Sequence, residues 1–487
     1  MEAFQTRTAL MAHQQTAVAK LLPSRVGGLF MDMGTGKSRA LIELARLRHA
    51  KVDHVVWFTP VSLKETVRQE ILKHTDCPPE DINVFGSKTR ADNLPKARWH
   101  VVGIESMASS SRVVLAVNAL VTSDSFVAVD ESSYIKGHRA LRTQRITAIA
   151  SRARYRAILT GTPFSQGVVD LFSQMSFLSP KILGYQSFWS FANNHLEYDV
   201  RENRYDGTVK QTNRIIASHN TGYIAAKIAP YVYQVKKSEC LDLPGKIYAE
   251  RYCFMTPEQQ GWHDTAKREF LAEMQAADDF SPVWLFKLFT ALQTIACGFW
   301  NRTLPGRKVE LIEMKHGRLD LLSSTVAEIP DGEKVIVWCK YLRPLGEIAA
   351  RLERDYGPGE VARFDGTLNE GQRAAELARW RRPGCRFLVA TQSSGGHGLT
   401  LNEAAHSVFY ADGFKYSERI QAEDRNHRIG QGVSPTYLTL ECIGSIDGRI
   451  QKALATKADA LSLFVREVEA VKATGVKEGL LSLIRSL

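Results

Sequence analysis

Short apolar runs alternate with segments of helical periodicity over the first third of the chain. Each run has the length of a β-strand, and the stretches between most of them repeat apolar residues every three or four positions. The strands expected here are 29–31, 54–58, 82–85, 99–104, 126–129 and 156–159. This alternation is typical of a mostly parallel sheet with helices on both faces. Because such sheets bind ligands at the carboxyl ends of their strands, polar residues just after each run are the candidates for chemistry.

The same alternation returns over the last third of the chain, from about residue 334. The expected strands are 335–338, 361–364, 387–390, 407–410 and 436–440. The expected helices cover 342–352, a stretch from Glu370, and 418–427. This second α/β layout resembles the first, as a duplicated core would.

The middle of the chain loses the alternation. Helices are expected at 168–178, 257–277 and 282–299, and the polar stretch 193–220 is expected to be rich in loops. The sequence therefore predicts an α/β fold with two parallel-sheet units in tandem and a helical insertion between them. The predicted division is 1–164, 165–330 and 331–487.

Length and composition bound the class of protein. A chain of 487 residues exceeds one ordinary domain. Its seven cysteines form no Cys-x-x-Cys pair, which argues against zinc and against a disulfide framework. No apolar run is long enough to span a membrane, and the N-terminus has no secretion signal. We therefore expect a cytoplasmic protein with no membrane partner.

The positive charge of the chain is concentrated in its first third. The formal net charge is +11, of which residues 1–164 contribute +9, residues 165–330 nothing and residues 331–487 +2. A localised basic excess suggests a polyanionic partner, most simply nucleic acid. Ordinary solubilising charge is the alternative.

A glycine-rich turn at the start of a helix is the strongest candidate site. The turn consists of Gly34, Thr35, Gly36, Lys37 and Ser38. A strand–turn–helix of this kind points backbone N–H groups and the positive end of a helix dipole at one spot, which suits phosphates. Lys37 would reach the β- and γ-phosphates, and Ser38 would ligate Mg²⁺. Met31 stands where the strict pattern has its first glycine, so a turn that binds nothing is the alternative.

Two adjacent carboxylates, Asp130 and Glu131, follow the apolar run at 126–129. Such a pair at the end of a buried strand is costly unless a cation meets it. Asp130 would hold Mg²⁺, and Glu131 would polarise the water that attacks the γ-phosphate. A helix-capping acidic pair is the alternative, but it is disfavoured by the glycine-rich turn upstream.

Two weaker signals accompany this site. Gln14 could read an adenine edge with one donor and one acceptor, although a surface glutamine is the default. Residues 160–163 place small hydroxyl residues round a glycine after a strand, which suits a switch that senses the nucleotide but equally an ordinary turn.

A stretch from 138 to 156 carries six arginines and no acid. Arg139, Arg142 and Arg145 recur every third residue and are expected near one helical face. Our hypothesis is that this face meets a phosphate backbone. A solvated basic helix is an equally good interpretation.

The second α/β unit contains two dense polar stretches. Residues 390–401 follow a strand and include Gly398, whose lack of a side chain permits close approach of the backbone to a phosphate; a surface loop is the alternative. Residues 421–431 contain Arg425 and Arg428, three apart and expected on one helix face. Aimed at a γ-phosphate, they would act as arginine fingers. Ion pairs with neighbouring carboxylates are the alternative.

Together these motifs resemble the core of helicase superfamily 2, and specifically the Snf2 family of DNA-dependent ATPases. The resemblance is carried by residues 33–38, 130–136, 159–163, 395–401 and, most specifically, 421–431. It is closest to the branch that includes annealing and fork-remodelling enzymes, and the length suggests a compact bacterial or viral form. Ser133 stands where the family usually has His, and Phe414 where it tends to have Trp.

The resemblance implies two RecA-like lobes that close on ATP and Mg²⁺ and bind duplex or branched DNA through its backbone. It does not identify protein partners. The implied catalytic residues are Glu131, Gln421, Arg425 and Arg428. The implied nucleotide-binding residues are Gln14, Gly34, Thr35, Gly36, Lys37, Ser38 and Gly398. The implied magnesium ligands are Ser38 and Asp130.

Three functions remain open at this point. The first is an ATP-dependent translocase on duplex or branched DNA, as the family usually is. The second is a strand-separating helicase on DNA or RNA. The third is a DNA-binding scaffold with a decayed ATPase site. The evidence against it is that the following residues are all intact: Lys37, Asp130, Glu131, Arg425 and Arg428.

Overall fold

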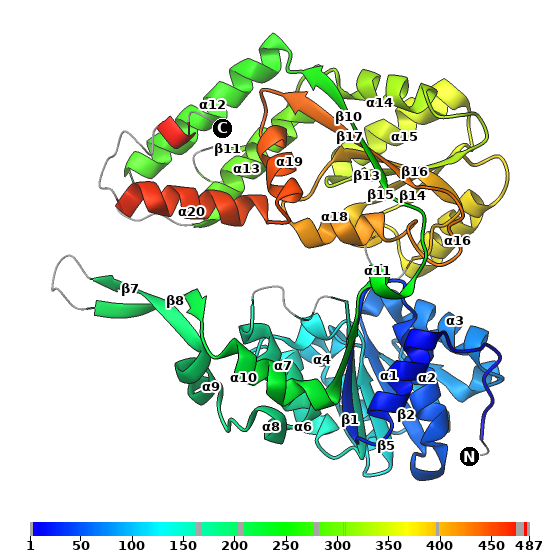
Figure 1. The fold of residues 1–487 in the computed structure, drawn as a ribbon. Coiled ribbons are helices and arrows are strands. Elements are labelled where there is room, and N and C mark those ends of the chain that lie inside the picture. The colour runs from blue at the N-terminus through cyan, green and yellow to red at the C-terminus, as the bar shows by residue number, and fades with distance from the viewer. Residues whose placement is uncertain are drawn as a thin grey trace. The chain divides into compact units, whose positions relative to one another are not determined.

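The computed structural model describes residues 3–161, 163, 167–202, 209–276, 282–304, 306, 308–395, 399–473 and 482–484. They form two compact units, Met1–Asp242 and Leu243–Leu487, hereafter unit 1 and unit 2 (Figure 1). Each unit contains one large parallel sheet, which confirms the predicted fold class of two α/β lobes.

Unit 1 is built on a seven-stranded sheet in which every pairing is parallel. Its strand order is β3-β4-β2-β5-β6-β1-β9. The strands are β1 (Val26–Met31), β2 (His54–Thr59), β3 (Ile82–Val84), β4 (Trp99–Gly103), β5 (Ser125–Val129), β6 (Tyr155–Thr160) and β9 (Val232–Val235). Every residue of β1, β4 and β5 is buried, because helices cover both faces of the sheet.

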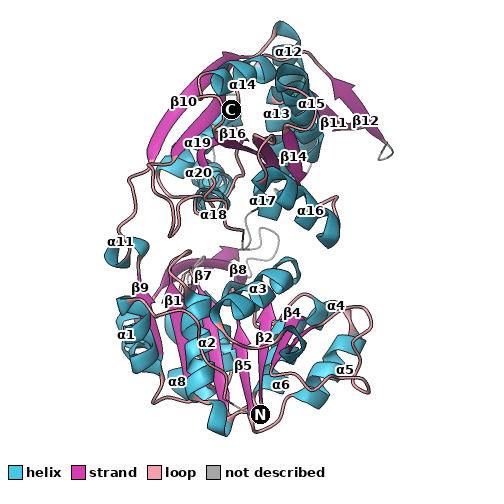
Figure 2. Cartoon of the chain, turned by 90° about the vertical axis from the view of Figure 1, so that its right-hand side faces the viewer, coloured by secondary structure: helices cyan, strands magenta, loops and turns pink. Residues whose placement is uncertain are grey.

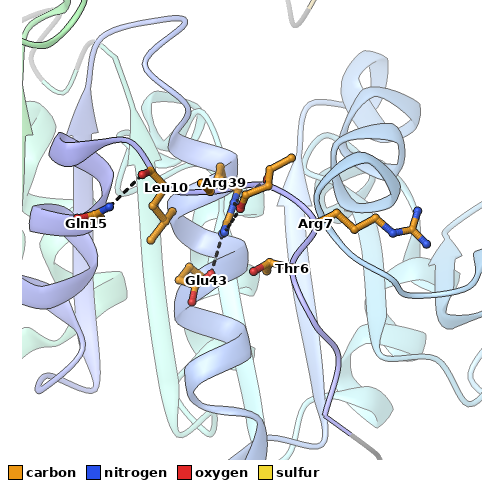
Figure 3. A pocket seen from close by; sticks show the side chains of 8 residues that line it. Thr6, Arg7, Leu10, Gln15, Arg39 and Glu43 are labelled. Carbon is orange, nitrogen blue, oxygen red and sulfur yellow. Dashed lines mark hydrogen bonds and ion pairs between the residues drawn. The ribbon is translucent and has the colours of Figure 1, made fainter.

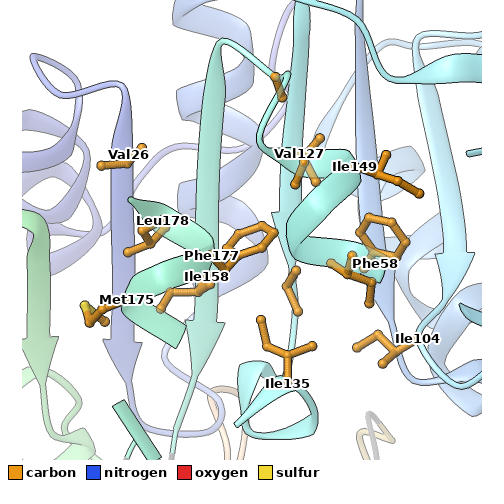
Figure 4. Packing of buried hydrophobic residues seen from close by; sticks show 14 of the residues in the cluster. Val26, Phe58, Ile104, Val127, Ile135, Ile149, Ile158, Met175, Phe177 and Leu178 are labelled. Carbon is orange, nitrogen blue, oxygen red and sulfur yellow. The ribbon is translucent and has the colours of Figure 1, made fainter. Parts of the chain in front are cut away.

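The helices of unit 1 divide between the two faces of this sheet (Figure 2). One face packs against α1 (Ala12–Leu21), α2 (Lys37–Leu47) and α3 (Lys64–His74). The other packs against α5 (Ser111–Leu120), α6 (Leu141–Ala150) and α7 (Val169–Leu178). On this second face, Ile158 of β6 lies beside Phe177 and Leu178 of α7 (Figure 4). The shorter helices are α4 (Ser106–Ser109), α8 (Pro180–Leu183), α9 (Phe188–His195), α10 (Thr221–Ile228) and α11 (Lys237–Cys240).

Unit 2 is built on a six-stranded parallel sheet with the order β10-β17-β16-β13-β15-β14. The strands are β10 (Ile247–Phe254), β13 (Lys334–Cys339), β14 (Val361–Phe364), β15 (Phe387–Thr391), β16 (Ala404–Ala411) and β17 (Thr436–Ile443). One face packs against α14 (Arg318–Ala327) and α15 (Leu342–Tyr356), and the other against α16 (Glu370–Arg381) and α18 (Tyr416–Glu423). The one-turn helix α17 (Gln392–Gly395) follows β15.

A helical cluster completes unit 2. It buries a shared apolar core between α12 (Pro257–Ala276), α13 (Pro282–Ala296), α19 (Asp447–Ala455) and α20 (Ala460–Ala473). Two strands, β11 (Phe299–Thr303) and β12 (Val309–Glu313), form an antiparallel hairpin after α13. The helix expected at 282–299 therefore ends at Ala296, and Phe299 begins a strand.

The middle of the chain contains strands that its sequence does not indicate. The prediction of a loop-rich stretch at 193–220 is wrong, because β7 (Leu196–Glu202) and β8 (Val209–Ser218) pair as an antiparallel hairpin. Two further strands of this region were not predicted: β9 joins the unit 1 sheet beside β1, and β10 joins the unit 2 sheet beside β17. The boundary between the units at Asp242 and Leu243 coincides with neither predicted boundary, and an independent insertion at 165–330 stays a prediction.

No helix in the described part of the chain is both long and apolar enough to cross a membrane. No group of three or more His, Cys, Asp or Glu side chains there could hold a metal ion.

Candidate active site

The glycine-rich turn of unit 1 lies between β1 and the first residue of α2, as predicted. Gly34 and Gly36 both have left-handed backbone conformations, with φ of 81° and 80°. A Cβ atom at Gly36 would lie 2.1 Å from the amide nitrogen of Gln14, so the turn requires glycine there on two grounds. The Lys37 amine folds back over the turn and donates to the carbonyl oxygens of Met31 at 2.9 Å and Asp32 at 3.2 Å.

Three side chains hold the turn in shape. The Thr35 hydroxyl donates to the Asp32 carbonyl oxygen at 2.7 Å. The Thr35 carbonyl oxygen in turn lies 2.8 Å from His13 Nε2 and accepts from the Gln14 amide at 3.0 Å. Gln14 is buried, and its amide oxygen accepts from the Met11 backbone N–H at 3.0 Å. The Gln14 amide therefore supports the turn through its donor and the start of α1 through its acceptor, and its predicted contact with adenine stays a prediction.

The acidic pair follows β5 in the same sheet. The Asp130 backbone N–H donates to the Phe58 carbonyl oxygen at 2.7 Å, and the Asp130 carboxylate accepts from the Glu131 backbone N–H at 3.0 Å. Burial and the neighbouring Glu131 carboxylate raise the pKa of Asp130 to about 7, against the opposing effect of Lys37. Lys37, Asp130 and the turn thus act electrostatically on one another, so the structure brings the predicted half-site of unit 1 together.

Glu131 has a left-handed backbone conformation, with φ of 47° and ψ of 57°. This region is sparsely populated by residues other than glycine, asparagine and aspartate, and it costs about 1 kcal/mol or more. Such strain clusters at functional sites, where the surrounding structure imposes it. It turns the chain directly into the 3₁₀ turn at Ser132–Ile135.

A buried glutamine that sequence analysis missed joins two of the predicted motifs. Gln174 of α7 is fully buried, and its side-chain oxygen accepts from the Ser132 hydroxyl at 2.6 Å. Its side-chain nitrogen donates to the carbonyl oxygens of Pro163 at 3.0 Å and Asp170 at 2.9 Å. Gln174 thus links the turn after the acidic pair to the segment at 160–163, of which Thr162 lies outside the described residues. The sequence offered little signal for Gln174, because the same helical stretch also carries Asp170, Ser173 and Ser176.

A cavity of about 490 Å³ lies beside α2 (Figure 3). It is lined by the N-terminal segment Thr6, Arg7, Thr8, Ala9 and Leu10, and by Gln15, Arg39 and Glu43. The Arg39 guanidinium donates to the Glu43 carboxylate at 2.8 Å and to the Thr8 carbonyl oxygen at 2.7 Å. The cavity is therefore polar on the side of the helix that begins at Lys37, where these hydrogen bonds lie.

The first three arginines of the basic stretch at 138–156 make contacts within unit 1. Arg139 precedes α6 and lies over the ring of Trp189 at 5.4 Å from its centroid. Arg142 donates to the Tyr134 carbonyl oxygen at 2.8 Å, and Arg145 donates to that of Met107 at 2.8 Å. The hypothesis that these three arginines meet a phosphate backbone stays untested.

In unit 2 the predicted arginines follow a helix instead of sharing its face. The helix expected at 418–427 ends at Glu423, so Arg425 and Arg428 lie in the turns that come after it. Arg425 is buried and donates to the carbonyl oxygens of Gln421 at 3.1 Å and Leu399 at 3.3 Å. Arg428 is half-buried and donates to the Asp424 carbonyl oxygen at 2.7 Å and the Thr400 hydroxyl at 3.4 Å.

The two predicted stretches of unit 2 are therefore adjacent in space, because both arginines bond to residues 399–400. Gly398, the predicted phosphate-binding glycine of this segment, lies outside the described residues. The Glu423 carboxylate, which was a possible ion-pair partner of the arginines, contacts Arg419 at 2.9 Å and Lys246 at 2.8 Å.

A phosphate-binding turn with its lysine, and an acidic pair after another strand of the same parallel sheet, define a P-loop nucleotide-binding α/β protein. Its family follows from the sequence comparisons. A family model of the SNF2-related domain matches residues 11–297, and one of the helicase conserved C-terminal domain matches residues 317–430. The chain therefore belongs to the SNF2-related family, and the predicted membership is confirmed.

Named relatives are distant and longer. The chain is 25% identical to the DNA annealing helicase and endonuclease ZRANB3 of Mus musculus, over 93% of this chain and 40% of that protein. It is 24% identical to the ISWI chromatin-remodeling complex ATPase ISW2 of Saccharomyces cerevisiae, over 95% of this chain and 41% of that protein. The chain spans about two fifths of the length of these curated relatives.

A solved structure is similar along the whole chain at low sequence identity. It is the Sulfolobus solfataricus SWI2/SNF2 ATPase core in complex with dsDNA, with a TM-score of 0.42 and 20% identity. The alignment covers 99% of this chain and 98% of that chain.

Proposed function

We propose that the chain hydrolyses ATP to ADP and phosphate in a DNA-stimulated, Mg²⁺-dependent reaction and translocates on duplex or branched DNA. The observation that carries the proposal is the pairing of the Lys37 turn with Asp130 and Glu131 in the same sheet, within a chain that matches both domains of the family. The basic excess of residues 1–164 supports a nucleic-acid partner. The similarity to ZRANB3, which is a DNA annealing helicase and endonuclease, also supports it.

The residues of unit 1 fit a nucleoside triphosphate. The left-handed glycines expose backbone N–H groups at the positive end of α2, and phosphate oxygens can replace the carbonyl oxygens that the Lys37 amine now contacts. The adjoining cavity suits a nucleoside, because its volume is of the right order and Thr8, Gln15 and Arg39 supply polar groups on its walls. We therefore assign the phosphates to the turn and the base and ribose to this cavity.

The donor set also fits magnesium. Burial, and after it the neighbouring Glu131 carboxylate, raises the pKa of Asp130, and a divalent cation would stabilise the ionised form. The Ser38 hydroxyl and the Asp130 carboxylate are hard oxygen ligands. Magnesium bound with nucleotide phosphates usually needs only one or two protein ligands, so the small donor set is sufficient. When bound, the ion neutralises phosphate charge. Glu131 would then orient the attacking water and accept its proton.

The arginines of unit 2 supply the remaining chemistry in this proposal. Arg425 and Arg428 carry permanent positive charge and planar groups that match phosphate oxygens, so they would stabilise the charge that develops on the transferring phosphoryl group. Gln421, whose carbonyl oxygen accepts from Arg425, would act with them. The close approach of the Gly398 backbone to a phosphate is part of the same proposal.

The test is the steady-state rate of ATP hydrolysis with single-stranded DNA, duplex, fork, junction and RNA. We expect low turnover alone and strong stimulation by duplex or forked DNA. A strand-separating helicase would instead release a labelled strand in a fluorescent unwinding assay, more so with a single-stranded tail. Absence of hydrolysis with every nucleic acid would favour a scaffold and would reject the proposal.

A further inference from the structure

The segment that connects the two units begins on the phosphate-binding turn. Strand β9 pairs with β1, the strand that leads into the turn. The Asp32 backbone N–H donates to the Val235 carbonyl oxygen at 3.2 Å, and the Asp32 carboxylate accepts from the Lys237 backbone N–H at 2.8 Å. Asp32 thereby satisfies one of the unpaired N–H groups at the start of α11. The chain that leaves unit 1 is thus bonded to a residue of the turn itself.

The same segment ends on the arginine-bearing turn of unit 2. The Pro244 carbonyl oxygen lies 2.9 Å from His427 Nε2. The Lys246 amine lies 2.8 Å from the Glu423 carboxylate and 3.6 Å from that of Asp424. The Tyr248 hydroxyl also donates to Glu423, at 2.8 Å. These partners flank Arg425 in sequence, so the incoming chain is fixed to the residues immediately around it.

The contacts of the connecting segment with unit 2 hold the buried Glu423 carboxylate in a fixed position. Glu423 is buried, and a buried carboxylate is costly unless its charge is paired and its oxygens are bonded. Lys246 and Tyr248 meet one of its oxygens, and Arg419 meets the other at 2.9 Å. Loss of Lys246 would leave this carboxylate undercompensated just before the arginine turn.

The chain between the two ends is short and stiff. We call residues 236–246 the strap. It contains no glycine before Gly245, and Pro244 fixes its own φ and restricts Leu243 as well. Seven peptide units separate Lys237 from Pro244 and span at most about 25 Å when extended. The strap is therefore much shorter than the long Gly/Ser linkers that absorb a displacement of the parts they join.

We propose that the strap is a positioning element that couples the phosphate-binding turn to the orientation of Arg425 and Arg428, with Lys246 as its positioning residue in unit 2. This inference rests on the proposed function, since it concerns the regulation of the same ATPase site. Nucleotide-dependent movement of the turn pulls on Asp32 and β9. The strap passes the movement to Pro244 and Lys246, and these set the turn that carries the two arginines.

The first test lengthens the strap without touching either end. A Gly-Gly-Ser insertion after Asp242 should lower the DNA-stimulated kcat about tenfold and leave the KM for ATP within about twofold, because positioning fails while nucleotide binding persists. The matched control is the same insertion after Pro358, in an exposed loop of unit 2 between α15 and β14. The control should hydrolyse ATP at the parental rate, and both proteins should unfold at the parental temperature.

The second test removes the anchor in unit 2. Lys246→Met should lower kcat about tenfold at unchanged KM, and Lys246→Arg, which can still pair with Glu423, should restore most of the rate. Lys452→Met, on the exposed side of α19, is the matched control. If both changes break one connection, the insertion and Lys246→Met combined should be no slower than the slower single variant.

The outcomes separate this inference from the proposed function. A parental protein without DNA-stimulated hydrolysis would overturn both. A parental protein that hydrolyses ATP, with parental kcat in the insertion and Lys246→Met variants, would overturn the strap alone. Equal loss of rate in Lys246→Met and Lys246→Arg, or multiplicative losses in the combined variant, would also overturn it.

Discussion

The side-chain oxygen of Gln174 accepts a hydrogen bond from the hydroxyl of Ser132 at 2.6 Å. Both residues are fully buried, and the bond joins α7 to the turn that carries the acidic pair. Because the amide nitrogen of Gln174 also holds the Pro163 carbonyl oxygen, one side chain fixes two motif segments. Removal of the Gln174 side chain should therefore disturb the position of the acidic pair, although the residues proposed to contact ATP are unchanged.

Gln174→Leu and Ser132→Ala should each lower kcat about tenfold, because the acidic pair loses a support that holds it in place. The double variant should be no slower than the slower single one, with a coupling of about 1 kcal/mol, since both changes remove the same bond. The measurement is steady-state hydrolysis of the four proteins with duplex DNA. Gln69→Leu, on the exposed face of α3, is the control. Independent effects of the two changes on kcat would contradict a role for the Ser132–Gln174 hydrogen bond.

Lys37→Ala should reduce DNA-stimulated hydrolysis to background, because the turn loses its charge contact with the β- and γ-phosphates. Nucleotide binding measured with a fluorescent ATP analogue should weaken in parallel. The control is Lys20→Ala, an exposed lysine in the last turn of α1. Turnover of Lys37→Ala at the parental rate would remove the phosphate-binding turn from the mechanism.

Glu131→Gln and Glu131→Asn should both abolish hydrolysis, because each replaces the proposed base with a neutral amide. The two should differ in stability. Asparagine tolerates the left-handed conformation at this position better than glutamine does, so the Asn variant should unfold about 2 °C higher. Scanning calorimetry compares the pair, and equal unfolding temperatures would show that the backbone at this residue stores no strain.

The stability of unit 1 should fall in mild acid because of His100. Burial, together with repulsion from the neighbouring His54, lowers the pKa of His100 to about 4, against an ordinary value of 6.5. The unfolded chain therefore binds a proton that the folded chain excludes between these values, and stability is lost as pH falls through this window. At about 1.4 kcal/mol per pH unit, the loss from pH 6.5 to pH 5 is about 2 kcal/mol.

His100→Gln should remove most of this acid sensitivity. Urea unfolding at about pH 7 and pH 5 compares the variant with the parental protein. Other acidic groups titrate in the same range, so the informative quantity is the difference between the two proteins in their loss of stability. His54, which faces His100 with ring centroids 5.5 Å apart, is kept in both. An equal loss in both proteins would place the acid sensitivity elsewhere.

Arg142 and Arg145 allow a separation of structural and nucleic-acid roles. Arg142→Lys and Arg145→Lys keep the charge but lose the guanidinium hydrogen bonds to the carbonyl oxygens of Tyr134 and Met107. Each should therefore lower the free energy of unfolding by about 1 kcal/mol. If the segment meets a phosphate backbone, these variants should keep the parental salt dependence of DNA binding. Charge reversal at both positions should flatten it, and an unchanged slope after reversal would reject the hypothesis.

The periodicity of the chain was sufficient to predict both large sheets but not their outer members. Strands such as Phe387–Thr391 lie as expected, because they are apolar runs buried in a parallel sheet. β9 has only four residues, and β10 is the exposed edge of its sheet, so neither has an uninterrupted apolar pattern. The hairpin of β7 and β8 belongs to neither large sheet, and its polar composition resembles that of a loop.

The candidate site was also predicted only in part. Motif residues such as Lys37 and Asp130 lie where the strand ends predict them, since the sheet itself brings strand ends together. Gln174, Asp32 and Lys246 were missed because they act through hydrogen bonds and ion pairs to residues distant in sequence. Short-range periodicity carries no information about such pairs. The turn that holds Arg425 was read as helix because its sequence gives no glycine or proline before Gly430.

The position of β9 decides how the first α/β domain can be produced as an isolated fragment. A fragment cut near residue 164 would leave β1, an apolar strand, with one bare hydrogen-bonding edge. Such an edge recruits strands from other molecules, so the truncated protein should aggregate. A fragment that extends through Asp242 carries its own terminal strand and is the one suited to nucleotide titration by NMR.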